Sequence, residues 1–475
     1  MASSGAPLPR ALEDLARSLE REWSADSPPI PPALREYRKE WLDTMLQPVR
    51  EISLEETALR LGRGRPVVVG DFHPSGRARR NLGSLLAGLR GTGRLGLILE
   101  LLPASLVRPA ALALRDPGPR LPNGERLVDA FRGSLEVLAA SGGIVAGGWE
   151  PGEPQERDLA AARTWRRLRV RFPDTRWVLY FGDWHLAGKH LPRALRAEGG
   201  RPVMLHQSPE PLWKRFPGPL QERFLDLGSD HLAWLHTPPL SHWARLLQNR
   251  EGDRWDPCLE AEIAEELCES LMLRLASALG LPEPGGFPSV WPADEWEGFR
   301  KTLPPGGQAA YSKTPGPKAP VFHPHLPLIW FDRPPGLNAL LEAAGHGIAC
   351  DWALAGQQDL LGRLVARAFR RLWAVRVNPL LLPADPEDLA RRLFPGQRAG
   401  YPGELVERAA TELARGRVPA LEGRPAILAV EILGARLGHG LAAREDLDRS
   451  WVRQLLQGGW KPLDWEALAA TIRAA

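Results

Sequence analysis

The chain has 475 residues, 44% of them hydrophobic and 25% charged, and a formal net charge of +4. This composition is typical of a globular protein with a sizeable core, and the length predicts two or three domains. Arginine carries nearly all of the positive charge, and acidic residues are interspersed with it. This pattern argues against the basic stripe by which proteins bind nucleic acid.

The sequence also lacks the features of secreted and membrane proteins. Its N-terminal residues contain no apolar segment of signal-peptide length, and no stretch approaches the roughly 18 apolar residues that cross a bilayer. The cysteines Cys258, Cys268 and Cys350 form no C-x-x-C pair, so neither a disulfide framework nor a cysteine zinc site is expected. We therefore expect a cytoplasmic protein whose thiols are reduced.

Residues 1–54 are predicted to be a helical segment. Apolar residues recur at helical spacing in 12–23 and again in 34–45, and the proline-rich residues 27–32 separate the two stretches. Ser53 and Glu56 then form the pattern of a capping box at the start of a short helix.

Residues 55–210 are predicted to form an α/β domain. Helix-like segments at 77–89, 127–140 and 156–172 alternate with apolar runs at 66–70, 95–99, 143–148, 177–181 and 202–205. Such alternation is typical of a mostly parallel sheet that helices cover on both faces. Functional groups in these sheets collect just beyond the carboxyl ends of the strands.

Residues 211–475 are predicted to be a largely α-helical C-terminal region. An amphipathic helix over 259–280 precedes a linker rich in proline and glycine over 281–320, and a strand is predicted within 322–331. Further helices are predicted over residues 336–376, 386–394, 403–415, 427–441 and 447–473.

Polar side chains come directly after each of the first four apolar runs. The sequence G-D-F-H at 70–73 follows the first run, and G-D-W-H at 182–185 follows the fourth. Glu100 follows the second run and Glu150 the third. Because the carboxyl ends of parallel strands meet at one edge, we expect these groups at one end of the sheet.

The residue types at this edge suit several kinds of chemistry. His73, Glu100 and His185 can supply three ligands to a metal ion and leave a position open for water. The same groups can transfer protons near neutral pH, and histidine is a common axial ligand of haem iron. Asp71 and Asp183 either orient the neighbouring histidines or cap the helices that follow, and we favour capping.

These motifs resemble those of the TIKI superfamily, which includes TraB and GumN-type proteins, erythromycin-esterase-like enzymes and the ChaN haem-binding proteins. Two G-x-x-H motifs with a glutamate after the intervening strand carry the resemblance, and residues 182–188 resemble the G-x-x-H-L-x-G form. Glu156-Arg157-Asp158 is similar to the E-R-[ND] element of the superfamily. The resemblance covers residues 55–210 and departs from the ChaN pattern at Asp71, where Glu is commoner.

The resemblance implies a ChaN-like protein that binds haem or a divalent metal ion through His73, Glu100, Glu150, Arg157 and His185. Arg157 is expected either to pair with a glutamate or contact an anionic group such as a haem propionate, or to belong to a surface network on its helix. The aromatic residues available to wall a haem cleft are Phe72, Trp149, Tyr180 and Trp184.

Two other functions remain open. The same site suits a metal-dependent or metal-free hydrolase, with His73 or Glu100 as base or ligand and His185 as ligand or acid. Alternatively, the chain is an interaction protein whose Trp-rich helical region binds a protein partner and whose sheet-edge site is vestigial. The expected ligand is a small molecule or haem, with no nucleic-acid or membrane partner, and the oligomeric state is left open.

Overall fold

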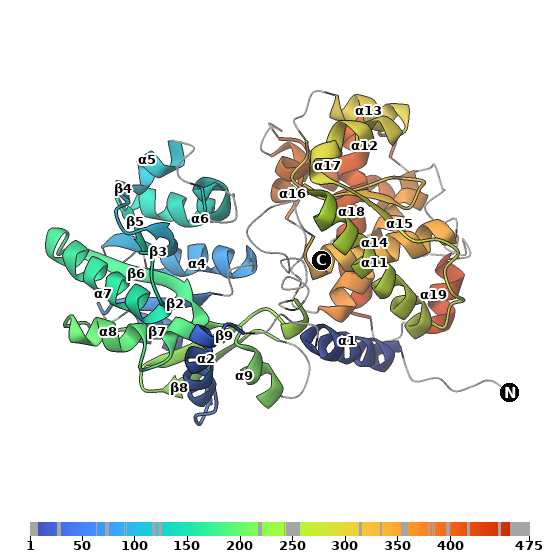
Figure 1. The fold of residues 1–475 in the computed structure, drawn as a ribbon. Coiled ribbons are helices and arrows are strands. Elements are labelled where there is room, and N and C mark those ends of the chain that lie inside the picture. Colours follow the sequence, from blue (N-terminus) through green and yellow to red (C-terminus); the bar gives the residue numbers. More distant parts are fainter. Residues whose placement is uncertain are drawn as a thin grey trace. The chain divides into compact units, whose positions relative to one another are not determined.

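The chain forms two compact units in the computed structural model (Figure 1). One unit is Ser27–Trp255, and the other combines Met1–Asp26 with Asp256–Ala475. The structure describes residues 8–25, 30–62, 64–71, 76–89, 91, 93–115, 120–121, 126–216, 221–241, 243, 257–312, 316–332, 335–352, 360–378, 381, 383, 385–395, 400–415, 419–444 and 448–456.

The first unit is built on a nine-stranded sheet with the order β1-β8-β9-β7-β2-β6-β3-β5-β4. The strands β9-β7-β2-β6-β3-β5 pair in parallel, and antiparallel strands extend the sheet at both edges. This arrangement confirms the predicted α/β class. The strands are β1 (Arg50–Ile52), β2 (Val67–Asp71), β3 (Arg94–Pro103), β4 (Val107–Pro109), β5 (Ile144–Trp149), β6 (Thr175–Gly182), β7 (Val203–Gln207), β8 (Arg223–Gly228) and β9 (His231–Leu235).

Helices cover both faces of this sheet, as the continuous apolar strands require. Val67 and Val69 of β2 pack on one face with α3 (Leu54–Leu61), α4 (Gly76–Leu89), α5 (Ala110–Arg115) and α6 (Leu127–Ala140). Val68 points to the opposite face, against α7 (Pro154–Arg171), the 3-10 helix η2 (Asp183–Leu186) and α8 (Leu191–Ala197). Further along that face, α2 (Pro32–Met45) and α9 (Glu210–Arg215) pack on β8 and β9.

The boundaries of the α/β unit differ from the predicted 55–210. The hairpin of β8 and β9 extends the sheet beyond residue 210, and its turn places Gly228, Ser229 and Asp230 at positive φ. Helix α2 also belongs to this unit, because Trp41 and Met45 are buried against the hairpin. The first helix, α1 (Leu8–Ala25), belongs to the other unit. The segment 1–54 is therefore not a single structural element.

The second unit is largely helical, as predicted. Its elements are α1, α11 (Pro257–Leu279), β10 (Ser289–Trp291), η3 (Ala293–Glu295), α12 (Trp296–Thr302), α13 (Pro305–Tyr311), β11 (Val321–Phe322), β12 (Leu328–Trp330), α14 (Leu337–Asp351), α15 (Leu360–Val377), α16 (Pro386–Leu393), α17 (Tyr401–Ala414), α18 (Gly423–Ala442) and α19 (Arg449–Leu456). The predicted linker at 281–320 is wrong, since β10, α12 and α13 lie within it and bury Phe299 and Tyr311. The predicted helical residues 457–473 lie outside the described residues.

Helix α18 is long and apolar enough to cross a membrane, and it is the one such helix in the described part of the chain. Its most apolar stretch is 67% buried within the protein. Gly434 and Gly438 let it approach α15 closely, because a Cβ at either position would lie within 3 Å of α15 atoms. Helix α18 therefore packs as a core helix.

Candidate functional site

A cluster of buried polar side chains lies where β3 and β6 end. Glu100 comes from β3 and His185 from η2, which follows β6 directly. Arg157 and Asp158 come from the first turns of α7, which covers this face of the sheet. Glu100, Asp158 and His185 are 5%, 3% and 6% exposed, so their charges require partners within the protein.

The imidazole of His185 lies between two carboxylates. Its Nδ1 is 2.7 Å from Asp158 Oδ1, the distance of a strong charge-assisted hydrogen bond. Its Nε2 is 3.5 Å from Glu100 Oε1, which is longer than a normal hydrogen bond. Asp158 accepts only, so Nδ1 carries a proton and Nε2 is the ring atom that faces Glu100.

Glu100 is held in place by the backbone of the neighbouring strand. Strands β3 and β6 pair as far as Leu99 and Tyr180, and β3 then becomes irregular. The amide of Gly182 donates to Glu100 Oε2 at 2.6 Å, so the side chain replaces a ladder bond where the strands separate. This fixes one carboxylate oxygen and leaves Oε1 facing His185 and Arg157.

Arg157 lies at the edge of the cluster. Its guanidinium is 3.9 Å from Glu100 Oε1, and its side chain is 27% exposed. Its Nε is buried and has no hydrogen-bond partner among the described residues. Of the predicted alternatives, the structure favours proximity to Glu100 over a surface network.

A tyrosine from α2 completes the support of His185. The hydroxyl of Tyr37 donates to Asp158 Oδ2 at 2.6 Å. Burial raises the pKa of Tyr37 well above its usual value, as do the charge and hydrogen bond of Asp158, so the phenol remains a neutral donor. The Tyr37 ring also stacks on His190, with ring centroids 3.5 Å apart.

The two carboxylates raise the pKa of His185. Burial alone would lower that pKa, because it disfavours the charged imidazolium. The hydrogen bond to Asp158 and the charges of Glu100 and Asp158 outweigh burial. The site thus favours the protonated, positively charged form of this ring.

Asp183 belongs to a separate hydrogen-bonded chain beside this cluster. Its carboxylate accepts from Trp41 Nε1 at 2.6 Å and lies 2.9 Å from His206 Nδ1. His206 Nε2 is 3.0 Å from His231 Nδ1, and burial together with the charge of His206 lowers the pKa of His231 to about 3. The favoured capping role of Asp183 is wrong, because no side chain caps η2.

Gly70 makes room for Asp183. A Cβ at Gly70 would lie 1.7 Å from Asp183 Oδ1, so the two G-D motifs are in direct contact. Asp71, at the end of β2, is buried at 3% exposure. It adds to the effect of burial in raising the pKa of Tyr180 well above its usual value. Asp71 therefore lies close to the Tyr180 side chain.

Several predicted site residues lie elsewhere. Glu150 is half-exposed and lies 3.8 Å from Arg163, outside the cluster. Tyr180 is buried on the other face of the sheet and cannot wall a cleft beside His185. Trp149 is 41% exposed, and Trp184 packs beneath α2. Phe72 and His73 lie outside the described residues.

The structure brings together three of the five predicted ligand residues, namely Glu100, Arg157 and His185. Among the described residues, no group of three His, Cys, Asp or Glu side chains is arranged to hold a metal ion. Asp158 and Tyr37 come from helices and were not among the site residues predicted from the strand ends. Asp158 was nevertheless visible in the E-R-[ND] element, whereas no sequence signal singled out Tyr37.

Comparisons with protein-family models, with curated proteins and with solved structures found no match for this chain.

Proposed function

We propose that the chain binds a divalent metal ion at the edge of the sheet, with His185 and Glu100 as two of its ligands. His73, two residues beyond the end of β2, is the third ligand that the motif resemblance implies. The ligand set of two histidines and one carboxylate is that of open zinc sites.

The distance between His185 Nε2 and Glu100 Oε1 carries this proposal. At 3.5 Å it is too long for a charge-assisted hydrogen bond, although both groups are buried. Two ligands bonded to one tetrahedral ion at about 2.0–2.1 Å stand about 3.3 Å apart. The pair thus has the spacing of two ligands of one ion.

The contacts behind these two atoms also fit metal ligands. Asp158 accepts from Nδ1 of His185 and so directs Nε2 toward Glu100, as carboxylates do behind metal-binding histidines. The Gly182 amide holds the other Glu100 oxygen. A divalent ion bound there would lower the pKa of a coordinated water and polarise a substrate oxygen.

The position of Arg157 supports a second candidate function, that of a metal-free hydrolase like those of the TIKI superfamily. Its guanidinium lies beside Glu100, where it can stabilise negative charge that develops on a substrate. The raised pKa of His185 suits a general acid. In this alternative Glu100 is the base, and no ion is needed.

Metal analysis and calorimetric titration of the full chain test the proposal, with Zn²⁺ and Mn²⁺ as ligands. The variants are His185→Ala, Glu100→Gln and His73→Ala. Glu150→Gln is the matched control, because Glu150 follows β5, the strand beside β3, but lies outside the cluster. Haemin is titrated in parallel, and binding is followed by its absorbance spectrum.

We expect about one metal equivalent per chain in the wild type and in Glu150→Gln. The other variants should lose this bound metal. Unchanged metal binding in His185→Ala contradicts the proposal. If no metal binds, but haemin binds saturably and His185→Ala weakens that binding, the ligand of the site is haem and not a metal ion. Ester hydrolysis by metal-stripped protein that Glu100→Gln abolishes favours the metal-free hydrolase instead.

A further inference from the structure

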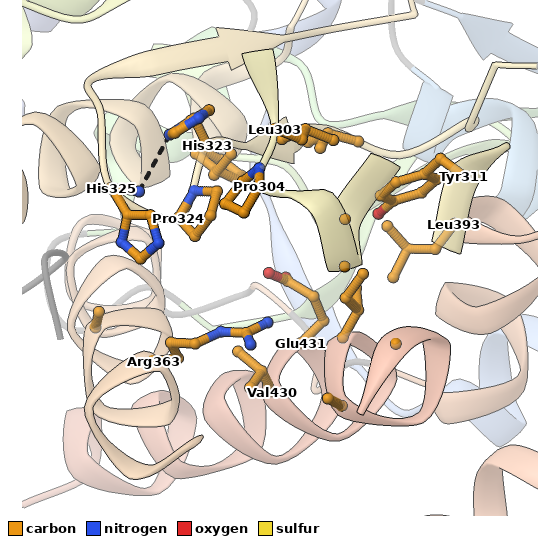
Figure 2. A pocket seen from close by; sticks show the side chains of 18 of the residues that line it. Leu303, Pro304, Tyr311, His323, Pro324, His325, Arg363, Leu393, Val430 and Glu431 are labelled. Atoms are coloured by element: carbon orange, nitrogen blue, oxygen red, sulfur yellow. Dashed lines mark hydrogen bonds between the residues drawn. The ribbon is translucent and has the colours of Figure 1, made fainter. Parts of the chain in front are cut away.

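The helical unit contains a cavity of about 700 Å³ that the sheet-edge site does not use. This size suits a small organic molecule, for which pockets of about 300–1,000 Å³ are usual. Figure 2 shows its walls, in which Leu303, Pro304 and Tyr311 lie across from Arg363 and Glu431. Most of the lining is apolar, with leucine, proline, valine and isoleucine side chains.

Arg370 and Glu431 line the cavity and belong to a network of buried arginines and carboxylates that is centred on α15. Arg367 is 2.6 Å from Glu431 and 3.2 Å from Glu342, and therefore bridges both carboxylates. Arg370 is 3.1 Å from Glu431, and Arg371 is 3.1 Å from Glu342. Three arginines thus contact these two carboxylates.

Arg363 adds a further positive charge at the cavity wall. It lies one heptad before Arg370 on α15, and Figure 2 shows its side chain pointing into the cavity beside Glu431. No hydrogen bond or ion pair holds its guanidinium among the described residues. Burial lowers the pKa of Arg363, and the charges of Glu431 and Tyr311 oppose that effect only in part.

Arg370 has an unused donor at the same wall. The residue is 6% exposed and lines the cavity, and its Nε is buried without a hydrogen-bond partner among the described residues. Its guanidinium also lies 4.2 Å from the centre of the Phe322 ring, over the ring face. A buried cationic donor without an acceptor is costly, which points to an acceptor supplied by a ligand.

His323, in the H-P-H sequence at 323–325, also lines the cavity, but the protein itself engages both of its ring nitrogens. The backbone amides of His325 and Leu326 donate to His323 Nδ1 at 3.1 and 2.9 Å. His323 Nε2 therefore carries the proton and donates to the Thr302 carbonyl at 2.9 Å. Burial lowers the pKa of His323, so this ring fixes the loop as a neutral group.

We propose that this cavity binds a small organic acid with an apolar body and one carboxylate head, which Arg363 and Arg370 bind. The two guanidinium groups supply donors whose planar geometry matches a carboxylate. The apolar walls take up the body of the ligand. Glu431 stands beside the arginines and disfavours a second negative charge, so a carboxylate fits better than a dianionic phosphate.

Calorimetric titration of the full chain with decanoate tests this proposal, with 1-decanol and decyl phosphate as comparison ligands. Arg363→Gln removes the charge at the cavity wall, and Ile427→Trp fills the cavity from α18. Arg391→Gln is the matched control, because Arg391 is an exposed arginine on α16 of the same unit. A thermal melt of each variant establishes that it is folded.

We expect one decanoate per chain and weaker binding of 1-decanol. Arg363→Gln should weaken decanoate about tenfold, the value of one hydrogen bond to a charged group, and leave 1-decanol unchanged. Ile427→Trp should abolish binding of both, and Arg391→Gln should behave as the wild type. Equal binding of decanoate and 1-decanol, no decanoate binding, or full affinity in Arg363→Gln overturns the proposal. Tighter binding of decyl phosphate overturns the preference for a single charge.

Discussion

Replacement of Asp158 by Asn tests how the site holds a cation on His185. The Asp158 carboxylate accepts from His185 Nδ1 at 2.7 Å and from Tyr37 at 2.6 Å, and all three side chains are buried. A hydrogen bond between charged groups contributes about 1.5–3 kcal/mol. The amide of the variant keeps the shape but loses the charge. We therefore expect Asp158→Asn to lower the pKa of His185 and to weaken metal binding about 10–100-fold.

The pH dependence of stability follows from the direction of this shift. The pKa of His185 in the folded protein lies above its ordinary value of 6.5. The stability that the charged His185 ring contributes is fully present below pH 6.5, and it is lost as the pH rises through the raised pKa. In Asp158→Asn this contribution should fall by about 1.5–3 kcal/mol at low pH. At high pH the free energies of unfolding of the variant and the wild type should converge.

Histidine-selective NMR titration of the full chain measures the pKa directly, and urea unfolding at several pH values measures the stability. Tyr37→Phe is the matched control, because it removes a donor to Asp158 without removing the carboxylate. That variant should keep the raised pKa of His185. If Asp158→Asn leaves both the pKa and the pH profile unchanged, Asp158 does not stabilise the charged ring, and the argument is wrong.

Two further predictions concern packing and buried charge. Gly70→Ala should destabilise the protein by about 3 kcal/mol in urea unfolding, because its Cβ would meet Asp183 Oδ1 at 1.7 Å. Gly133→Ala, with no atom within 4 Å of the new Cβ, should be neutral or stabilising, and equal losses would contradict the packing argument. Glu342→Gln should cost about 3–5 kcal/mol, since it leaves buried arginines without their carboxylate. Burial raises the pKa of Glu342, but the charges of the neighbouring arginines lower it by more, so the net pKa is lowered. The stability of the wild type should therefore fall as the pH drops through that lowered pKa. Glu342→Gln, which has no carboxylate to protonate, should lack this loss. The partly exposed Glu412, which pairs with the exposed Arg415, is the control. Glu412→Gln should stay within about 0.5 kcal/mol of the wild type, and a similar value for Glu342→Gln would refute the burial argument.

The parallel sheet could be predicted because its strands are buried on both faces. Apolar runs at 66–70 and 177–181 become β2 and β6, which pair in register from Val67 to Asp71. The order of the strands could not be read in the same way. It depends on the crossovers, since α7 carries the chain from β5 past β3 to β6. The hairpin of β8 and β9 was missed because its sequence lies among Trp-rich residues that suggested helices.

The site was predictable only where a strand end places its residue. Glu100 and His185 follow apolar runs directly, so the sheet alone brings them together. Asp158 and Tyr37 lie on helices, and Tyr37 is 121 residues before the carboxylate it contacts. Their meeting depends on how α2 and α7 pack on the sheet, which no local pattern encodes. Glu150 follows a strand too, but it is exposed to solvent beyond β5 and pairs with Arg163.

The G-D parts of the two G-D-x-H motifs fit together across neighbouring strands. They follow β2 and β6, which are neighbours, and Gly70 of the first motif leaves the space that Asp183 of the second occupies. Asp183 in turn holds Trp41 and His206, while His185 turns toward Asp158 and Glu100. Asp183 thus depends on Gly70, on the neighbouring strand, for the space that it occupies. A glycine at position 70 is therefore needed for the second motif to hold its aspartate at this place.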